Sequence, residues 1–182
     1  MWIGKTSKLA ASLLSILLLG GLTAGAAEAA CNQADLTGNW VLHGFGYDGE
    51  VSNTIRCPIK VKAAGKVAAG GRCTGTTVNA QGEFESGSST LAAGRALKVK
   101  SDCKVTGGLK LKVNREETQN AITFKLIGTS VITIESAQLS RDKEIVTGTA
   151  KEVFNGELTS EQLPEPIPQS SKSVAYFTLN KK

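Results

Sequence analysis

The chain has 182 residues, of which 41% are hydrophobic, 20% charged and 5% aromatic, and its formal net charge is +5. This composition is typical of one globular domain and excludes the collagen-like, coiled-coil and disordered classes. Because the chain has one histidine and four cysteines, it lacks most of the residues on which imidazole catalysis and clustered metal sites depend.

The beginning of the chain has the features of an export signal. An uncharged run rich in leucine and alanine, residues 9–27, follows Lys5 and Lys8, and it ends in the small-x-small motif Ala27-Glu28-Ala29. We therefore predict a signal peptide, residues 1–29, that is removed by cleavage after Ala29, and a secreted or periplasmic mature protein.

Two alternatives to cleavage follow from the same segment. One is a retained membrane anchor, but glycines thin the apolar run. The other is a lipoprotein acylated at Cys31, but Glu28 stands where such a signal has an apolar residue. The expected mature protein is a single domain, residues 30–182, without a membrane-spanning segment.

Alternation of apolar and polar residues with a period of two, which is typical of strands, dominates the mature chain. Turns rich in glycine, asparagine, serine and aspartate separate the alternating segments. These segments lie near Trp40 and at 55–61, 67–77, 84–91, 97–105, 109–113, 121–128, 131–139, 144–154 and 174–179. We predict an all-β domain, an antiparallel up-and-down barrel of about eight strands, with a β-sandwich as the alternative.

The segment 155–172 interrupts the alternation. It contains Pro164-Glu165-Pro166-Ile167-Pro168, and each proline removes a backbone donor and fixes φ. We therefore predict a long Pro-rich loop over 155–172. It is either a solvated connector to the last strand or a flap that docks a partner in an extended polyproline conformation.

The four cysteines form an even set in an exported chain, which predicts two disulfides rather than a zinc site. A three-residue turn at Ala64-Gly65-Lys66 places Cys57 directly opposite Cys73 on neighbouring strands. Cys31 is then left to bridge Cys103. The pairing of Cys31 with Cys57 and of Cys73 with Cys103 stays open, because one β-bulge shifts the register.

The sequence Asp35-Leu36-Thr37-Gly38-Asn39-Trp40 resembles the Gly-x-Trp signature that opens the calycin barrels, the lipocalin and avidin-type families. The resemblance implies a barrel that the tryptophan closes at one end and that opens on a ligand cavity at the other. It gives Gly38 and Trp40 a structural role. The later sequence Gly82-Glu83-Phe84 is more similar to the avidin side, but the mature chain has no second tryptophan, so biotin binding does not carry over. A C-terminal strand in place of a helix leaves a bacterial-style lipocalin-like barrel.

The calycin resemblance also implies a binding function. We expect an exported protein that holds a small apolar ligand or an envelope component inside the barrel, without a cofactor. The residues expected to line the cavity are Ile59, Val61, Leu97, Val99, Leu111 and Phe124.

An alternative function follows from charge, because basic residues outnumber acidic residues between residues 52 and 115. We name the predicted outward lysines the basic face: Lys60, Lys62, Lys98, Lys100, Lys110 and Lys112. This face, or the 155–172 loop, would serve an interaction protein, such as a macromolecular inhibitor or a surface-attachment factor, that contacts an anionic polymer, an envelope surface or a protein. Nucleic acid is disfavoured because Phe84 is the only aromatic residue in that stretch. Lysines that merely prevent edge-to-edge aggregation are the simpler interpretation.

Catalytic motifs are scarce. His43 is expected on the outer face of its strand, and no Gly-x-Ser-x-Gly motif supplies a nucleophile for it. The pairs Glu116-Glu117 and Glu83 with Glu85 contain the carboxylates that a glycosidase needs, but they lie in or beside turns. We therefore predict no catalytic residue and no metal site, with a hydrolase as the alternative.

Overall fold

The computed structural model of the protein describes residues 30–78, 84–119 and 122–182, so the predicted signal peptide, Gly82 and Glu83 lie outside the described residues. The described part of the chain forms nine strands and two short 3-10 segments, with no α-helix. The 3-10 segments are η1 (Gln33–Leu36) and η2 (Ala63–Gly65). The strands are β1 (Gly38–Tyr47), β2 (Ser52–Val61), β3 (Arg72–Val78), β4 (Phe84–Leu91), β5 (Leu97–Val99), β6 (Val105–Gln119), β7 (Ile122–Leu139), β8 (Ile145–Ser160) and β9 (Ile167–Lys181).

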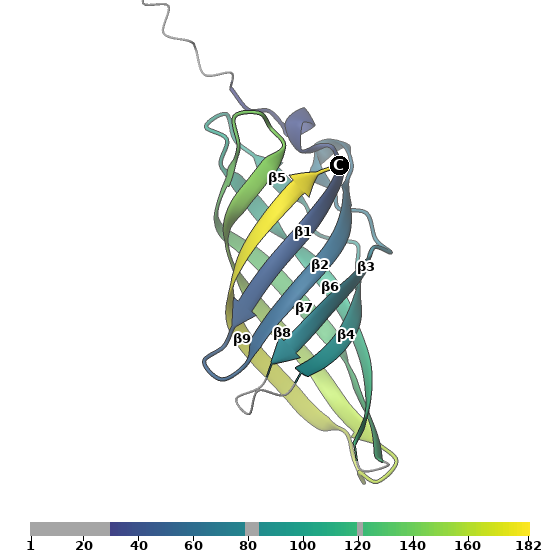
Figure 1. Cartoon of the computed structure of the whole chain (residues 1–182). Coiled ribbons are helices and arrows are strands. Elements are labelled where there is room, and N and C mark those ends of the chain that lie inside the picture. The colour runs from purple at the N-terminus through teal and green to yellow at the C-terminus, as the bar shows by residue number, and fades with distance from the viewer. Residues whose placement is uncertain (1–29, 79–83, 120–121) are drawn as a thin grey trace, which may run out of the picture.

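The strands form a closed antiparallel barrel (Figure 1). Strands β1 to β4 and β6 to β9 pair in chain order, β9 returns to pair with β1, and β4 pairs with β6. The short β5 pairs only with the beginning of β6. The predicted all-β, up-and-down barrel is therefore confirmed, and the alternative of a sandwich of two sheets is wrong.

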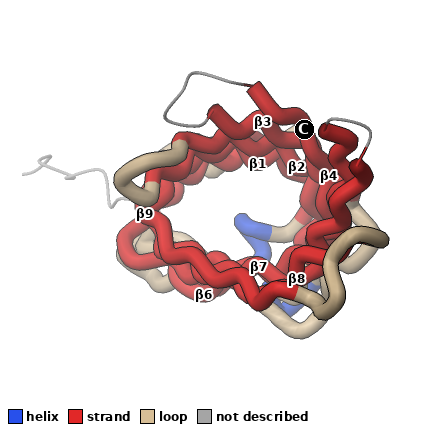
Figure 2. The backbone as a smooth tube through the Cα atoms, turned by 90° about the horizontal axis from the view of Figure 1, so that it is seen from below, coloured by secondary structure: helices blue, strands red, loops and turns tan. Residues whose placement is uncertain are grey.

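One end of the barrel is closed by a packed core. Trp40, Ile59 and Val61 are each 1% exposed there, and Leu36 of η1 is fully buried against them. Trp40 Nε1 donates a hydrogen bond of 2.9 Å to the Leu36 carbonyl oxygen, which satisfies the indole group inside the core. Figure 2, seen from below, shows η1 at the far end of the barrel.

The N-terminal arm, residues 31–36, is fixed across this closed end. Asn32 caps η1 and forms a capping box with Asp35, whose carboxylate accepts a 2.8 Å hydrogen bond from the Asn32 backbone N–H. The side chain of Gln33 bonds to the backbone of β5 twice, donating to the Leu97 carbonyl and accepting from the Val99 N–H. The disulfide between Cys31 and Cys103 ties the arm to the chain that leads into β6.

Asp35 links the stability of this arm to pH. The hydrogen bond from the Asn32 backbone lowers the pKa of Asp35, and the ammonium of Lys143, at 3.0 Å, lowers it further. A lowered pKa in the folded state stabilises the protein above the unfolded-state value of about 3.9, and this contribution is lost as the pH falls through the folded-state pKa.

We therefore expect Asp35→Asn to lower the free energy of unfolding at pH 7 by up to about 1 kcal/mol, because the amide oxygen can still accept from the Asn32 N–H but the charge that strengthens this bond and pairs with Lys143 is lost. Urea denaturation at pH 7 and near pH 2 measures this. The difference between the wild type and the variant should shrink as the pH falls through the folded-state pKa of Asp35, because the wild-type carboxylate then becomes protonated. A difference that is equally large at both pH values would contradict the assignment.

Both predicted disulfides, Cys57–Cys73 and Cys31–Cys103, are present, so the alternative pairing is wrong. The predicted three-residue turn is also wrong, because Val61 pairs with Val67 around η2. Extra residues at 68–71 then restore the expected register, in which Arg56 lies opposite Thr74. Cys57 and Cys73 follow in that register and are both fully buried.

The predicted Pro-rich loop over 155–172 is wrong for most of its length. β8 continues to Ser160 and β9 begins at Ile167, so only 161–166 connect the two strands. Pro168 lies within β9, opposite Glu157 of β8. Because β9 pairs with β1 only from Val174 onward, this part of β9 is an edge, where a missing backbone N–H is tolerated.

The strands of the barrel differ in length, so one side extends further than the other. The β1–β9 ladder ends at Tyr47 and Val174, whereas the β6–β7 and β8–β9 ladders continue to their hairpin turns. We call the extended part of β6 to β9 the overhang, residues 114–119, 122–128, 153–160 and 167–173. It lies below the barrel in Figure 1, at the end away from η1. The β4–β6 ladder is short and covers only Ser89–Leu91 and Leu111–Val113.

Candidate functional site

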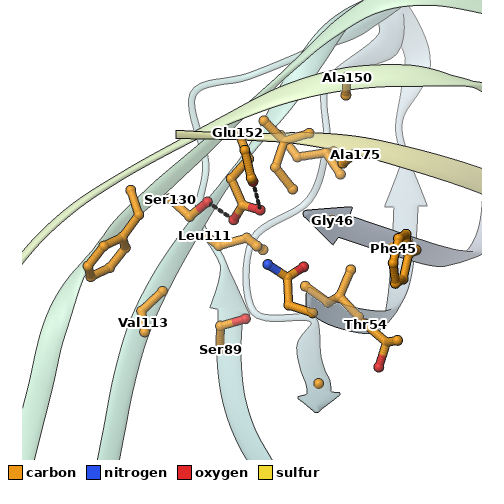
Figure 3. A pocket seen from close by; sticks show the side chains of 18 of the residues that line it. Phe45, Gly46, Thr54, Ser89, Leu111, Val113, Ser130, Ala150, Glu152 and Ala175 are labelled. Carbon is orange, nitrogen blue, oxygen red and sulfur yellow. Dashed lines mark hydrogen bonds between the residues drawn. The ribbon is translucent and has the colours of Figure 1, made fainter. Parts of the chain in front are cut away.

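A cavity of about 270 Å³ lies inside the barrel, between the core at the closed end and the overhang. All eight strands of the closed barrel contribute to its lining. Strand alternation turns every second side chain inward, and several of these positions are glycine or serine, which leaves space that larger side chains would fill. Figure 3 shows this pocket.

The wall nearest the core is apolar. It is formed by residues that belong both to the buried hydrophobic core and to the lining of the cavity: Leu42, Leu97, Leu109, Leu111, Ile132, Phe177 and Leu179. An apolar surface of this kind attracts the hydrocarbon part of a ligand.

A carboxylate, that of Glu152, interrupts the apolar lining on β8. It accepts a hydrogen bond from the hydroxyl of Ser130 on β7 and a second one, of 3.4 Å, from the hydroxyl of Ser173 on β9. Ser130 is 2% exposed and is the only polar residue that is buried among those the structure describes. Figure 3 shows Glu152 and Ser130 joined at the pocket wall.

Arg115 lies on the inward face of β6, on the side of the cavity where β4 and β6 separate. Its guanidinium donates a 3.1 Å hydrogen bond to the hydroxyl of Thr77 on β3. A Cβ atom at Gly87 would stand 2.2 Å from Arg115 Nε, so only glycine lets the guanidinium lie against β4 in this position.

Phe154 lines the cavity two residues further along β8 from Glu152. Its ring lies against Gly128 and Gly156, which are paired on β7 and β8, since a Cβ at either glycine would come within 2.7 Å of a ring carbon. The aromatic ring covers a stretch of sheet that has no side chain of its own. Phe154 therefore gives the cavity an apolar border where the barrel meets the overhang.

The structure brings two of the six predicted ligand-binding residues, Leu97 and Leu111, to the cavity. Ile59 and Val61 are instead packed beside Trp40 in the core, and Val99 is half-buried against that core. Phe124 lies on the overhang, opposite Ser160. Strand alternation predicts the face on which a residue lies but not its depth along the barrel axis.

The sequence prediction missed the polar part of the lining. Glu152 occupies the same strand face as Val146 and Ala150, and Arg115 the same face as Leu111 and Val113. A charged residue at a position that the alternation assigns to the apolar face was the signal that could have found both.

The predicted structural residues lie at the closed end. Gly38 begins β1 with a φ of +139°, a conformation that residues other than glycine rarely adopt. Trp40 lies two residues further along β1, and the centre of its ring is 5.6 Å from the ammonium of Lys181. Burial of the indole and these contacts make Trp40 part of the closure of the barrel.

The basic face is located on β2, β5 and β6 and in the segments that follow β2 and β5. Its lysines are exposed except for Lys110, which is half-buried, and none of the six forms an ion pair within the described part of the chain. A bridge between Lys66 and Ala96 joins the region after β2 to the region before β5. No contact with an anion follows from these positions alone, so that role stays a prediction.

The candidate catalytic groups do not assemble into a site. His43 is exposed on β1 as predicted, and Glu116 forms a 2.9 Å ion pair with Lys125 of the neighbouring strand. Glu83 and the side chains of Glu85 and Glu117 lie outside the described residues. Over residues 30–78, 84–119 and 122–182, no three His, Cys, Asp or Glu side chains gather as metal ligands.

In the described ranges there is no helix with the length and apolarity needed to cross a membrane. No protein-family model, no curated protein and no solved structure matches this chain.

Proposed function

We propose that the protein is an exported binding protein that holds a small, largely apolar molecule in its barrel. The observation that carries this proposal is the cavity of about 270 Å³, with an apolar wall formed by core residues. Protein interiors are close-packed, and a void of this size that is lined by every barrel strand is typical of a binding site.

The closed end supports the same function. Trp40 and η1 seal the barrel on one side, so the overhang side is the entrance to the cavity. A barrel sealed by a tryptophan at one end and hollow toward the other is the arrangement that the calycin resemblance implies. The two disulfides are compatible with an oxidising compartment outside the cytoplasm, where an exported binding protein would work.

The alternative function, an interaction protein that contacts an anionic polymer, an envelope component or a protein, uses the outside of the barrel. Its support is the exposure of the basic face. The segment 155–172, its other proposed surface, is mostly the β8–β9 hairpin of the overhang. Neither surface accounts for the cavity, so we favour the binding function.

A substitution that fills the cavity tests the proposal. Val113 points into the cavity from β6, and we expect Val113→Phe to weaken the binding of naphthylmethanol, a neutral apolar probe, at least about tenfold. Isothermal titration calorimetry measures the dissociation constants. The added ring occupies the volume that the probe needs.

The matched control is Val131→Phe, the same substitution on the outer face of β7, opposite Lys110. This variant should bind the probe as the wild type does. Equal weakening in both variants, or no saturable binding to the wild type, would show that the cavity does not hold the probe.

A further inference from the structure

The lining of the cavity contains a carboxylate, that of Glu152, with which no cation of the described residues forms an ion pair. Glu152 lies on the inward face of β8, between Ala150, which is fully buried, and Phe154, which borders the cavity. Glu152 is half-buried there, and a carboxylate that is partly removed from water is destabilising unless hydrogen bonds and an opposite charge compensate it. The two serines supply hydrogen bonds, but they supply no charge.

The carboxylate is held in a fixed position by the strands on both sides. Ser173 is the direct neighbour of Glu152 across the β8–β9 ladder, and Ser130 lies diagonally across the β7–β8 ladder. Each serine bonds to a different carboxylate oxygen. An ionised carboxylate accepts about four hydrogen bonds, so two positions remain for a ligand.

Among the described residues, no cation forms an ion pair with Glu152. Lys151 is next to it in sequence but projects from the opposite face of β8 and pairs with Glu135. Arg115, the one cationic residue of the lining, donates to Thr77 on β3 and lies against β4. The remaining charged residue of the lining, Asp48, is acidic and therefore adds to the negative charge.

We propose that the ligand of this cavity is a small apolar molecule that carries a protonated amine, with Glu152 as its counter-ion. This inference rests on the proposed binding function and names the chemical class of the ligand. The apolar part contacts the wall formed by Leu111 and Phe177, and the ammonium donates to the free positions of the Glu152 carboxylate. A ligand that places a carboxylate beside Glu152 is disfavoured, because two like charges would then lie together.

Three probes of the same shape test the inference in the wild-type protein: naphthylmethylamine, naphthylmethanol and naphthoic acid. A charge-assisted hydrogen bond to a carboxylate is stronger than a neutral one. By isothermal titration calorimetry near pH 7, we expect the amine to bind at least about tenfold more tightly than the alcohol, and the acid more weakly than either. Naphthylmethanol that binds as tightly as the amine would overturn the inference and leave the binding function intact. Absence of binding by all three would overturn both.

Substitution of Glu152, the proposed counter-ion, is the second test of the inference. Glu152→Gln keeps a side chain that bonds to the serines but removes the charge, so the affinity for the amine should fall to that for the alcohol. Glu157→Gln, on the outward face of the same strand, is the control and should leave both affinities unchanged. An amine preference that persists in Glu152→Gln would also overturn the inference. If this variant does not fold, the comparison of the three probes in the wild type decides alone.

Discussion

Replacement of Trp40 by alanine is expected to lower the free energy of unfolding by about 3–5 kcal/mol, the range for removal of a large buried aromatic side chain. The indole is 1% exposed, and it fills the closed end of the barrel between η1, β1 and β2. The substitution also leaves the Leu36 carbonyl without its 2.9 Å hydrogen bond. Urea denaturation followed by circular dichroism measures the loss.

Trp40→Phe separates the two contributions. Phenylalanine keeps most of the apolar contact area but cannot donate to Leu36, so this variant should lose less stability than the alanine variant. An alanine variant that loses less than about 1 kcal/mol would contradict the packing, because surface substitutions have effects of that size.

The second large effect is expected from the disulfide of the N-terminal arm. Cys31 and Cys103 are 72 residues apart in sequence, and Cys57 and Cys73 are 16 apart. By the loop-closure entropy of the unfolded chain, the longer loop corresponds to about 4 kcal/mol and the shorter to about 3 kcal/mol. Double substitution of Cys31 and Cys103 by serine should therefore destabilise the protein more than double substitution of Cys57 and Cys73.

Denaturation midpoints of the two double-serine variants, each with the other disulfide intact, provide the measurement. In the Cys31 and Cys103 variant the arm should detach more readily than the rest of the barrel unfolds, because η1 is then held without a covalent link, by hydrogen bonds, the Lys143–Asp35 ion pair and the packing of Leu36. The reverse order of stability would mean that local packing around Cys57 and Cys73, which are fully buried, outweighs the entropy difference.

Much of the fold could be predicted from strand alternation. Ile55, Cys57 and Ile59 alternate with Arg56, Pro58 and Lys60, so this strand has one face that must be buried. The opposed cysteines predict the correct β2–β3 register, although the turn between the two strands differs from the predicted one. The register is correct because it is set by the buried faces of both strands and by the disulfide, and the extra residues at 68–71 absorb the difference.

The Pro-rich segment shows where local composition misleads. Prolines at 164–168 predict a break, and a short turn is present. The residues on both sides nevertheless form a regular ladder, because the backbone of 155–160 pairs with β9. The composition of the segment itself does not predict this pairing. Only the overhang, where β9 is an edge, accommodates Pro168 in a strand.

The candidate site was predictable only in part. Alternation assigns Leu97 and Ile59 to the same inner surface, but one lines the cavity and the other is enclosed in the core. The difference depends on how far η1 and Trp40 fill the barrel along its axis, which is a property of the assembled fold. Glu152 could have been predicted as a site residue, because a charged residue on the apolar face of a strand is a signal of a functional site.

The short ladder between β4 and β6 is the place where the barrel is most easily opened. Every other pair of neighbouring strands in the closed barrel is joined over a longer ladder among the described residues, whereas β4 and β6 share only Ser89–Leu91 and Leu111–Val113. Local opening requires least free energy where the fewest interstrand hydrogen bonds must break. Local opening of the barrel is therefore expected first along this seam, where Arg115 lies against Gly87.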